Sequence, residues 1–110
     1  FDLDTGTPRW SKSYPVRYGN LGGYANGPRA QPTLHAGKVY TLGATGVLRC
    51  WDADGAVLWE RDLVRGWGAT VPEWGFAGAP LVHDGRLLVT AGGKDGAGVV
   101  ALDPATGKEL

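Results

Sequence analysis

The chain has 110 residues, of which 19 are glycine and one is cysteine, and its formal net charge is zero. The zero net charge gives no argument for a nucleic-acid or anionic-membrane partner, and no apolar run approaches the roughly 20 residues of a membrane-spanning helix. One cysteine cannot form an internal disulfide, so cysteine content does not indicate the redox compartment. The high glycine content has no three-residue period, which favours many tight turns between short strands.

A ten-residue pattern occurs three times, at the start, in the middle and at the end of the chain. Each copy has the end of an apolar strand, an aspartate, a turn closed by glycine, and then a second strand. The residues that define it are Asp2, Thr5, Gly6 and Trp10, then Asp52, Gly55 and Trp59, then Asp103, Thr106 and Gly107. The three aspartates are 50 and 51 residues apart, a period that indicates an array of similar units.

The chemistry of the pattern predicts its local structure. The aspartates are expected to accept hydrogen bonds from N–H groups of their own turns, and the threonine hydroxyls can join them. The glycines stand where a hairpin of this length needs a positive φ. The tryptophans, which follow the turns, are expected to bury a large flat surface, and alternation along the strand places Trp59 on the packed side.

Between the copies, the sequence predicts short antiparallel strands. Residues 7–14 form the outer strand of a first unit, and further strands are expected over 31–35, 38–42, 47–51, 57–63, 79–83, 86–90 and 99–102. Two-residue turns at Ala36-Gly37 and Asp84-Gly85 separate the first two strands of each later unit. A helical hydrophobic pattern is expected nowhere. Four short strands in about 50 residues is the size of one propeller blade.

The pattern Ala-x-Asp-x-x-Thr-Gly-x-x-x-Trp resembles the tryptophan-docking motif of β-propeller repeats of the pyrroloquinoline-quinone (PQQ) type. Ala101, Asp103, Thr106 and Gly107 fit it directly, whereas the middle copy is one residue shorter and has Cys50 in the alanine position. The resemblance implies an all-β fold of four-stranded antiparallel blades, in which each tryptophan docks on the motif of the neighbouring blade. It implies the end of a blade at 1–14, a blade at 29–63, and a blade lacking its last strand at 78–110.

Two blades would leave sheet faces and edges bare, which closed propellers avoid. We therefore expect this chain to be a piece of a longer propeller, with the remaining blades of the same chain as its first partners. Self-assembly of such pieces into a ring is the alternative.

The longer connections are the expected place for a ligand. In a four-stranded blade, residues 15–30, 43–46, 64–79 and 91–98 would all leave from one end, which we call the long-loop face, and long connections often carry function. A protein or small-molecule ligand is expected there. The candidate residues are Arg17, Tyr18, Asn20, Tyr24, Arg29, Trp67, Glu73 and Trp74.

Each of these candidates also has a purely structural interpretation. Glu73 between tryptophans could be a carboxylate in an apolar cleft, suited to acid–base chemistry, or the aromatics could simply pack the loop down. Arg17 and Arg29 could hold an anion, or pair with acids and carbonyls of the protein.

Other chemistry-bearing residues are predicted to be structural. His35 and His83 occupy matched positions before tight turns and lack the spacing of a metal-ligand set. Cys50 has the position in the middle copy that Ala101 has in the last copy, and it is expected to pack in the interior rather than act as a nucleophile. The stretch 92–96 looks like a phosphate loop but precedes no helix.

The resemblance implies two possible functions. The first is a non-catalytic binding or assembly scaffold, exported to the periplasm, similar in its repeats to the outer-membrane assembly lipoprotein of Gram-negative bacteria. The second is part of a PQQ-dependent alcohol or sugar dehydrogenase, with PQQ and calcium as cofactors. Enzymes of this fold use adjacent cysteines, absent here, and a calcium site that these loops do not reveal. We therefore prefer the first, and assign no catalytic, cofactor-binding or metal-binding residue.

Overall fold

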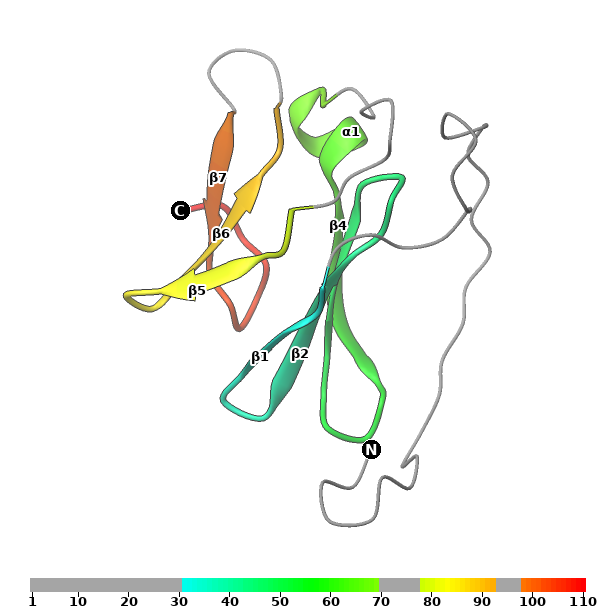
Figure 1. Ribbon diagram of the computed structural model, residues 1–110, viewed down its shortest axis with the longest axis vertical. Coiled ribbons are helices and arrows are strands. Elements are labelled where there is room, and N and C mark those ends of the chain that lie inside the picture. Colours follow the sequence, from blue (N-terminus) through cyan, green and yellow to red (C-terminus); the bar gives the residue numbers. More distant parts are fainter. Residues whose placement is uncertain (1–30, 70–77, 93–97) are drawn as a thin grey trace.

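The computed structural model describes residues 31–69, 78–92 and 98–110 (Figure 1). A first antiparallel sheet contains, in spatial order, β1 (Thr33–His35), β2 (Lys38–Leu42), β3 (Val47–Trp51) and β4 (Val57–Asp62). A second contains β5 (Leu81–His83), β6 (Arg86–Thr90) and β7 (Val99–Leu102). These strands confirm those predicted for the described residues, with ends that differ by at most two residues.

The first two strands of each sheet are joined by the predicted two-residue turns. Ala36 and Gly37 have φ of 49° and 76°, and Asp84 and Gly85 have φ of 54° and 71°. Positive φ at both central residues defines the hairpin turn that matches the natural twist of the strands. The pairing is in register on either side, with His35 opposite Lys38 and His83 opposite Arg86.

The aspartate turns also form as the sequence predicts. Asp52 Oδ1 accepts hydrogen bonds from the backbone N–H groups of Asp54 and Ala56, both at 2.9 Å. Asp103 Oδ1 accepts one from Ala105 at 2.9 Å. The closing glycines have positive φ, 87° at Gly55 and 72° at Gly107. The turns are thus held by their own side chains; the first copy, residues 2–10, lies outside the described residues.

The sequence shows no hydrophobic helix pattern and predicts only a connection over 64–79, but the one-turn helix α1 (Leu63–Trp67) follows β4 directly. Asp62 caps its N-terminus by accepting from the N–H groups of Val64 and Arg65. Gly68 ends the helix in the left-handed conformation, with φ of 65°. A single turn is too short to show a hydrophobic period, so only these two cap residues could have predicted it.

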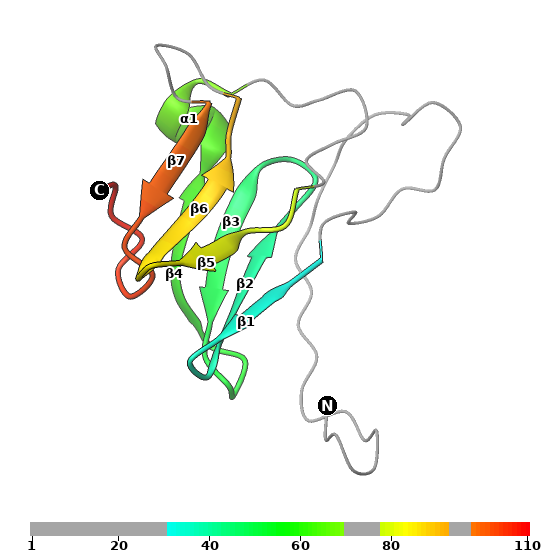
Figure 2. The same ribbon diagram turned by 60° about the vertical axis from the view of Figure 1, so that its left-hand side comes forward.

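The core lies between the two sheets, which stand side by side in Figure 1, whereas in Figure 2 the second sheet lies in front of the first. The first sheet contributes alternate residues of β2 and β3, and the second contributes alternate residues of β6 and β7. The buried members are Tyr40, Leu42, Leu48, Cys50, Leu87, Val89, Val100 and Leu102, joined by Leu63 from α1. Trp59 on β4 packs against this cluster, which confirms its predicted side.

The described loops divide between the two ends of the sheets. The β2–β3 turn, α1 and the ends of the β6–β7 connection lie together at one end, and the tight turns lie at the other (Figure 1). The backbone N–H of Leu63 donates to Gly46 O at 2.9 Å, which ties α1 to the β2–β3 turn. The described parts of the long-loop face therefore lie where the sequence predicted them. Within the described residues, no helix is long and apolar enough to cross a bilayer.

Candidate functional site

The two sheets are joined along a seam in which Trp59 has the central position. Its indole Nε1–H donates to the Pro104 carbonyl at 2.9 Å, across 45 residues of sequence. Its ring lies flat against Gly107, since a Cβ added there would come within 2.6 Å of Cε3 and 2.7 Å of Cδ2. Only glycine leaves room for this contact. Gly107 also has a positive φ, a conformation that glycine adopts without strain. A side chain on the last strand of the first sheet thus packs against the aspartate turn of the second sheet.

Tyr40 and Cys50 form the buried side of the seam. The Tyr40 ring lies 6.2 Å from that of Trp59, centroid to centroid, and its hydroxyl donates to the same Pro104 carbonyl at 3.4 Å. Burial, together with the neighbouring Cys50 thiol and Asp103, raises the pKa of Tyr40 to about 12. Burial likewise raises the pKa of the Cys50 thiol. Both groups are therefore neutral near pH 7, and Cys50 packs as an interior residue.

A second set of contacts, which we call the rim clasp, joins Arg61, Trp67 and Glu109 at the outer side of the seam. Arg61 Nη1 donates to the Gly107 carbonyl at 2.7 Å, and its guanidinium carbon lies 4.7 Å from the centre of the Trp67 ring. Trp67 Nε1 in turn donates to Glu109 Oε2 at 3.1 Å. Cation–π contacts of this kind contribute about 0.5–1 kcal/mol at exposed sites. The clasp fixes α1 to the end of the second sheet.

Trp67 is the only candidate ligand residue among those the structure describes. Its side chain is engaged in the rim clasp, with Arg61 and Glu109 as its partners. The other candidates lie outside the described residues: Arg17, Tyr18, Asn20, Tyr24, Arg29, Glu73 and Trp74. The cleft around Glu73 therefore stays a prediction. Arg61 and Glu109 were missed from sequence, although Arg61 shares the face of Trp59 by strand alternation.

The two histidines lie where the turns place them. His35 and His83 end β1 and β5 and are exposed. Over residues 31–69, 78–92 and 98–110, no three His, Cys, Asp or Glu side chains come together to hold a metal ion.

The family model described as outer membrane protein assembly factor BamB matches residues 1–110. The chain belongs to this family of PQQ-like repeat proteins. A comparison with curated proteins gives no match.

Among solved structures, BamB from Moraxella catarrhalis is 28% identical, with a TM-score of 0.53 over 76% of this chain and 22% of that one. The quinohemoprotein alcohol dehydrogenase from Comamonas testosteroni is 27% identical, with a TM-score of 0.57 over 74% of this chain and 12% of that one. A second such dehydrogenase, from Pseudomonas putida HK5, is 32% identical, with a TM-score of 0.54 over 71% and 12%.

These similarities establish the fold as a partial β-propeller of the quinoprotein type. The chain spans only about one eighth to one fifth of the length of these structures. They include both an assembly factor and PQQ-type dehydrogenases, so the architecture is shared by proteins of different function.

Proposed function

We propose that the chain is part of a non-catalytic propeller that acts as a binding or assembly scaffold in the periplasm of a bacterial cell envelope. The observation that carries the proposal is the use of Trp67 in the rim clasp. The Trp67 ring is contacted by the Arg61 guanidinium of its own sheet and donates to the Glu109 carboxylate beside the second sheet, so it serves to join α1 to that sheet. The family match to an assembly factor over the whole chain supports the same function.

A scaffold needs blades whose relative position is fixed, and the seam supplies this. The Trp59–Gly107 contact lies between the core and the rim clasp, so three layers of contacts join the same two blades. Loops carried on such a rigid base can present a surface to a protein partner without reorganising on binding. In this proposal, Arg17, Tyr18, Asn20, Tyr24, Arg29, Glu73 and Trp74 supply that surface.

The Trp59–Gly107 contact also suggests how successive blades are joined. Gly55 has the same place in its turn as Gly107, has a positive φ, and is buried although Asp54 and Ala56 beside it are exposed. Trp10 has the place of Trp59 in the first copy. We propose that tryptophan docking repeats along the ring, with Trp10 as the partner of Gly55.

Site-specific photocrosslinking in the intact parent protein tests the scaffold function. A photoreactive phenylalanine at position 74 should crosslink to an envelope protein, and Arg17→Ala should reduce that crosslink if the long-loop face binds the partner. The matched control is position 58, because Leu58 is 47% exposed on β4. Equal crosslinking from positions 58 and 74, or none from position 74, would contradict the proposed binding face.

A quinoprotein dehydrogenase is the second candidate, favoured by the 27% and 32% identities to quinohemoprotein alcohol dehydrogenases. In that case, other blades of the parent protein would have to hold PQQ and calcium. Adding both to the intact parent protein should give dye-linked alcohol oxidation and a thermal shift under this alternative. The scaffold function predicts neither.

A further inference from the structure

The outer side of α1 takes no part in the seam. Leu63 and Trp67, the first and last residues of the helix, lie on its inner side, with Leu63 fully buried in the core and Trp67 held in the rim clasp. Val64, Arg65 and Gly66 between them are exposed. We call these three residues the α1 face. They lie at the long-loop end of the sheets, where α1 extends beyond the strands (Figure 1).

The α1 face has a fixed shape because the helix is held at both ends. Asp62 caps its first turn, and the backbone N–H of Gly68 donates to the Val64 carbonyl at 3.0 Å. The hydrogen bond from Leu63 to Gly46 and the rim clasp hold the helix against the two sheets. A surface held in this way needs no ordering when it binds a partner.

Gly66 is not required by the packing or the backbone of the described residues. It does not have a positive φ, and a Cβ added to it would meet no described atom within 4 Å. Alanine is the more stable residue at an open helical position, since glycine loses more conformational freedom on folding. Glycine is useful at such a position where another backbone has to come close.

Arg65 gives the α1 face its charge. Its side chain is 91% exposed, and its ion pair among the described residues is a loose one with Asp62, 3.9 Å from Nε to Oδ2. Asp62 Oδ1 is already used by the helix cap. The guanidinium can therefore donate to a carboxylate from outside through two parallel N–H groups. Val64, which is 37% exposed, adds an apolar contact beside it.

We propose that the α1 face docks on a protein partner whose surface carries an aspartate or glutamate beside a closely approaching backbone segment. Arg65 binds the carboxylate, and Gly66 leaves room for the backbone. The inference rests on the proposed scaffold function and names the chemistry of the partner that the long-loop face binds.

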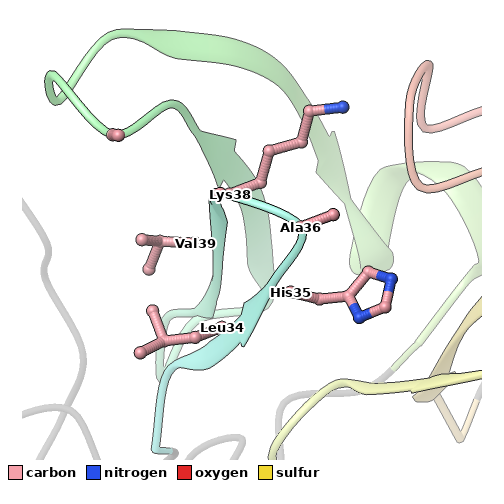
Figure 3. A pocket seen from close by; sticks show the side chains of 7 residues that line it. Leu34, His35, Ala36, Lys38 and Val39 are labelled. Carbon is pink, nitrogen blue, oxygen red and sulfur yellow. The ribbon is translucent and has the colours of Figure 1, made fainter.

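The open pocket of about 360 Å³ around the β1–β2 hairpin is the weaker docking surface (Figure 3). Its apolar side, with Leu34 and Val39, belongs to a sheet face, and such faces pack on neighbouring blades in a propeller. The α1 face lies beyond the end of the strands and stays accessible when the sheets are covered.

Zero-length coupling tests the carboxylate. In cell envelopes that contain the intact parent protein, Arg65→Lys keeps the charge and supplies an amine, which a carbodiimide joins only to a carboxylate in direct contact. Mass spectrometry should find position 65 joined to an aspartate or glutamate of another protein. Lys38 and Lys108 are internal controls, because they follow turns at the other end of the sheets and should not couple to the same residue.

Gly66→Ala, introduced into the Arg65→Lys protein, tests the close approach. It should increase the folding equilibrium constant about two- to fivefold, seen as a higher urea midpoint, yet lower the coupling at position 65 at least about fivefold. Gly78→Ala is the matched control, because Gly78 is exposed, lacks a positive φ and has no described atom near an added Cβ. It should leave the coupling unchanged.

Four results would overturn the α1 face as a docking site. They are no coupling at position 65, coupling only to Asp62 or to a second copy of the chain, equal coupling in the two alanine variants, and a lower urea midpoint for Gly66→Ala. The last would mean that the fold of the parent protein, rather than a partner, requires the glycine.

These outcomes are separate from those that test the proposed function. Crosslinking from position 74 without coupling at position 65 would overturn the α1 face and leave the scaffold function standing. Coupling at position 65 without crosslinking from position 74 would leave the α1 face standing and contradict the binding surface proposed for the long loops.

Discussion

Replacement of Trp59 by alanine should lower the free energy of unfolding by about 3–5 kcal/mol, the range for large side chains that pack against a core. The side chain fills the space above Gly107, contacts Tyr40 and donates to the Pro104 carbonyl. Trp59→Phe keeps most of the packing and removes the N–H donor, so it should cost only about 1–2 kcal/mol. Leu58→Ala is the matched control, because Leu58 is 47% exposed on the neighbouring position, and its expected cost is under about 1 kcal/mol.

The partner side of the contact gives a sharper test. Gly107→Ala introduces a left-handed alanine, which costs about 1–2 kcal/mol, and a Cβ that overlaps the Trp59 ring at 2.6 Å. Its total cost should be about 2–4 kcal/mol. Gly85→Ala isolates the backbone part, because Gly85 has φ of 71° and its added Cβ would meet nothing within 4 Å.

Urea unfolding followed by far-ultraviolet circular dichroism measures all of these variants, with Gly107→Ala repeated in the Trp59→Ala background. Without the indole ring, the cost of Gly107→Ala should fall to that of Gly85→Ala. Contacting residues give such non-additive double-mutant cycles. Equal costs of Gly107→Ala in the two backgrounds would refute the seam contact, as would a Trp59→Ala cost below about 1 kcal/mol.

Three further predictions concern titration and the turns. Because folding raises the pKa of Tyr40 from 10 to about 12, this residue should contribute a fall in stability of about 2–3 kcal/mol between pH 10 and 12; urea unfolding across this range should show a shallower fall for Tyr40→Phe. Asp52→Ala removes the acceptor of two turn N–H groups and should cost about 1–2 kcal/mol in urea unfolding, against under about 0.5 kcal/mol for the exposed neighbour Asp54→Ala. Asp62→Ala removes the cap of α1 and should cost about 1 kcal/mol, a value that a change below 0.3 kcal/mol in the same assay would contradict.

Much of the local structure was predictable because it depends on residues close in sequence. An aspartate that bonds its own turn, a glycine at positive φ and alternation along a short strand need no information from the rest of the chain. This is why the strands, the tight turns and the Asp52 and Asp103 hairpins were predicted. The helix α1 was missed, since a single turn is defined by two cap residues rather than by a period.

The sequence by itself determined the repeat, and with it the blade architecture and the packed side of Trp59, because a period of about 50 residues is visible in the order of residues alone. Only the tertiary structure decided which side chains meet across the seam. Arg61 and Glu109 are ordinary surface charges in the sequence, and Trp67 resembles a ligand-binding aromatic. Their partners lie more than 40 residues away along the chain and come within hydrogen-bond distance only when the two sheets pack.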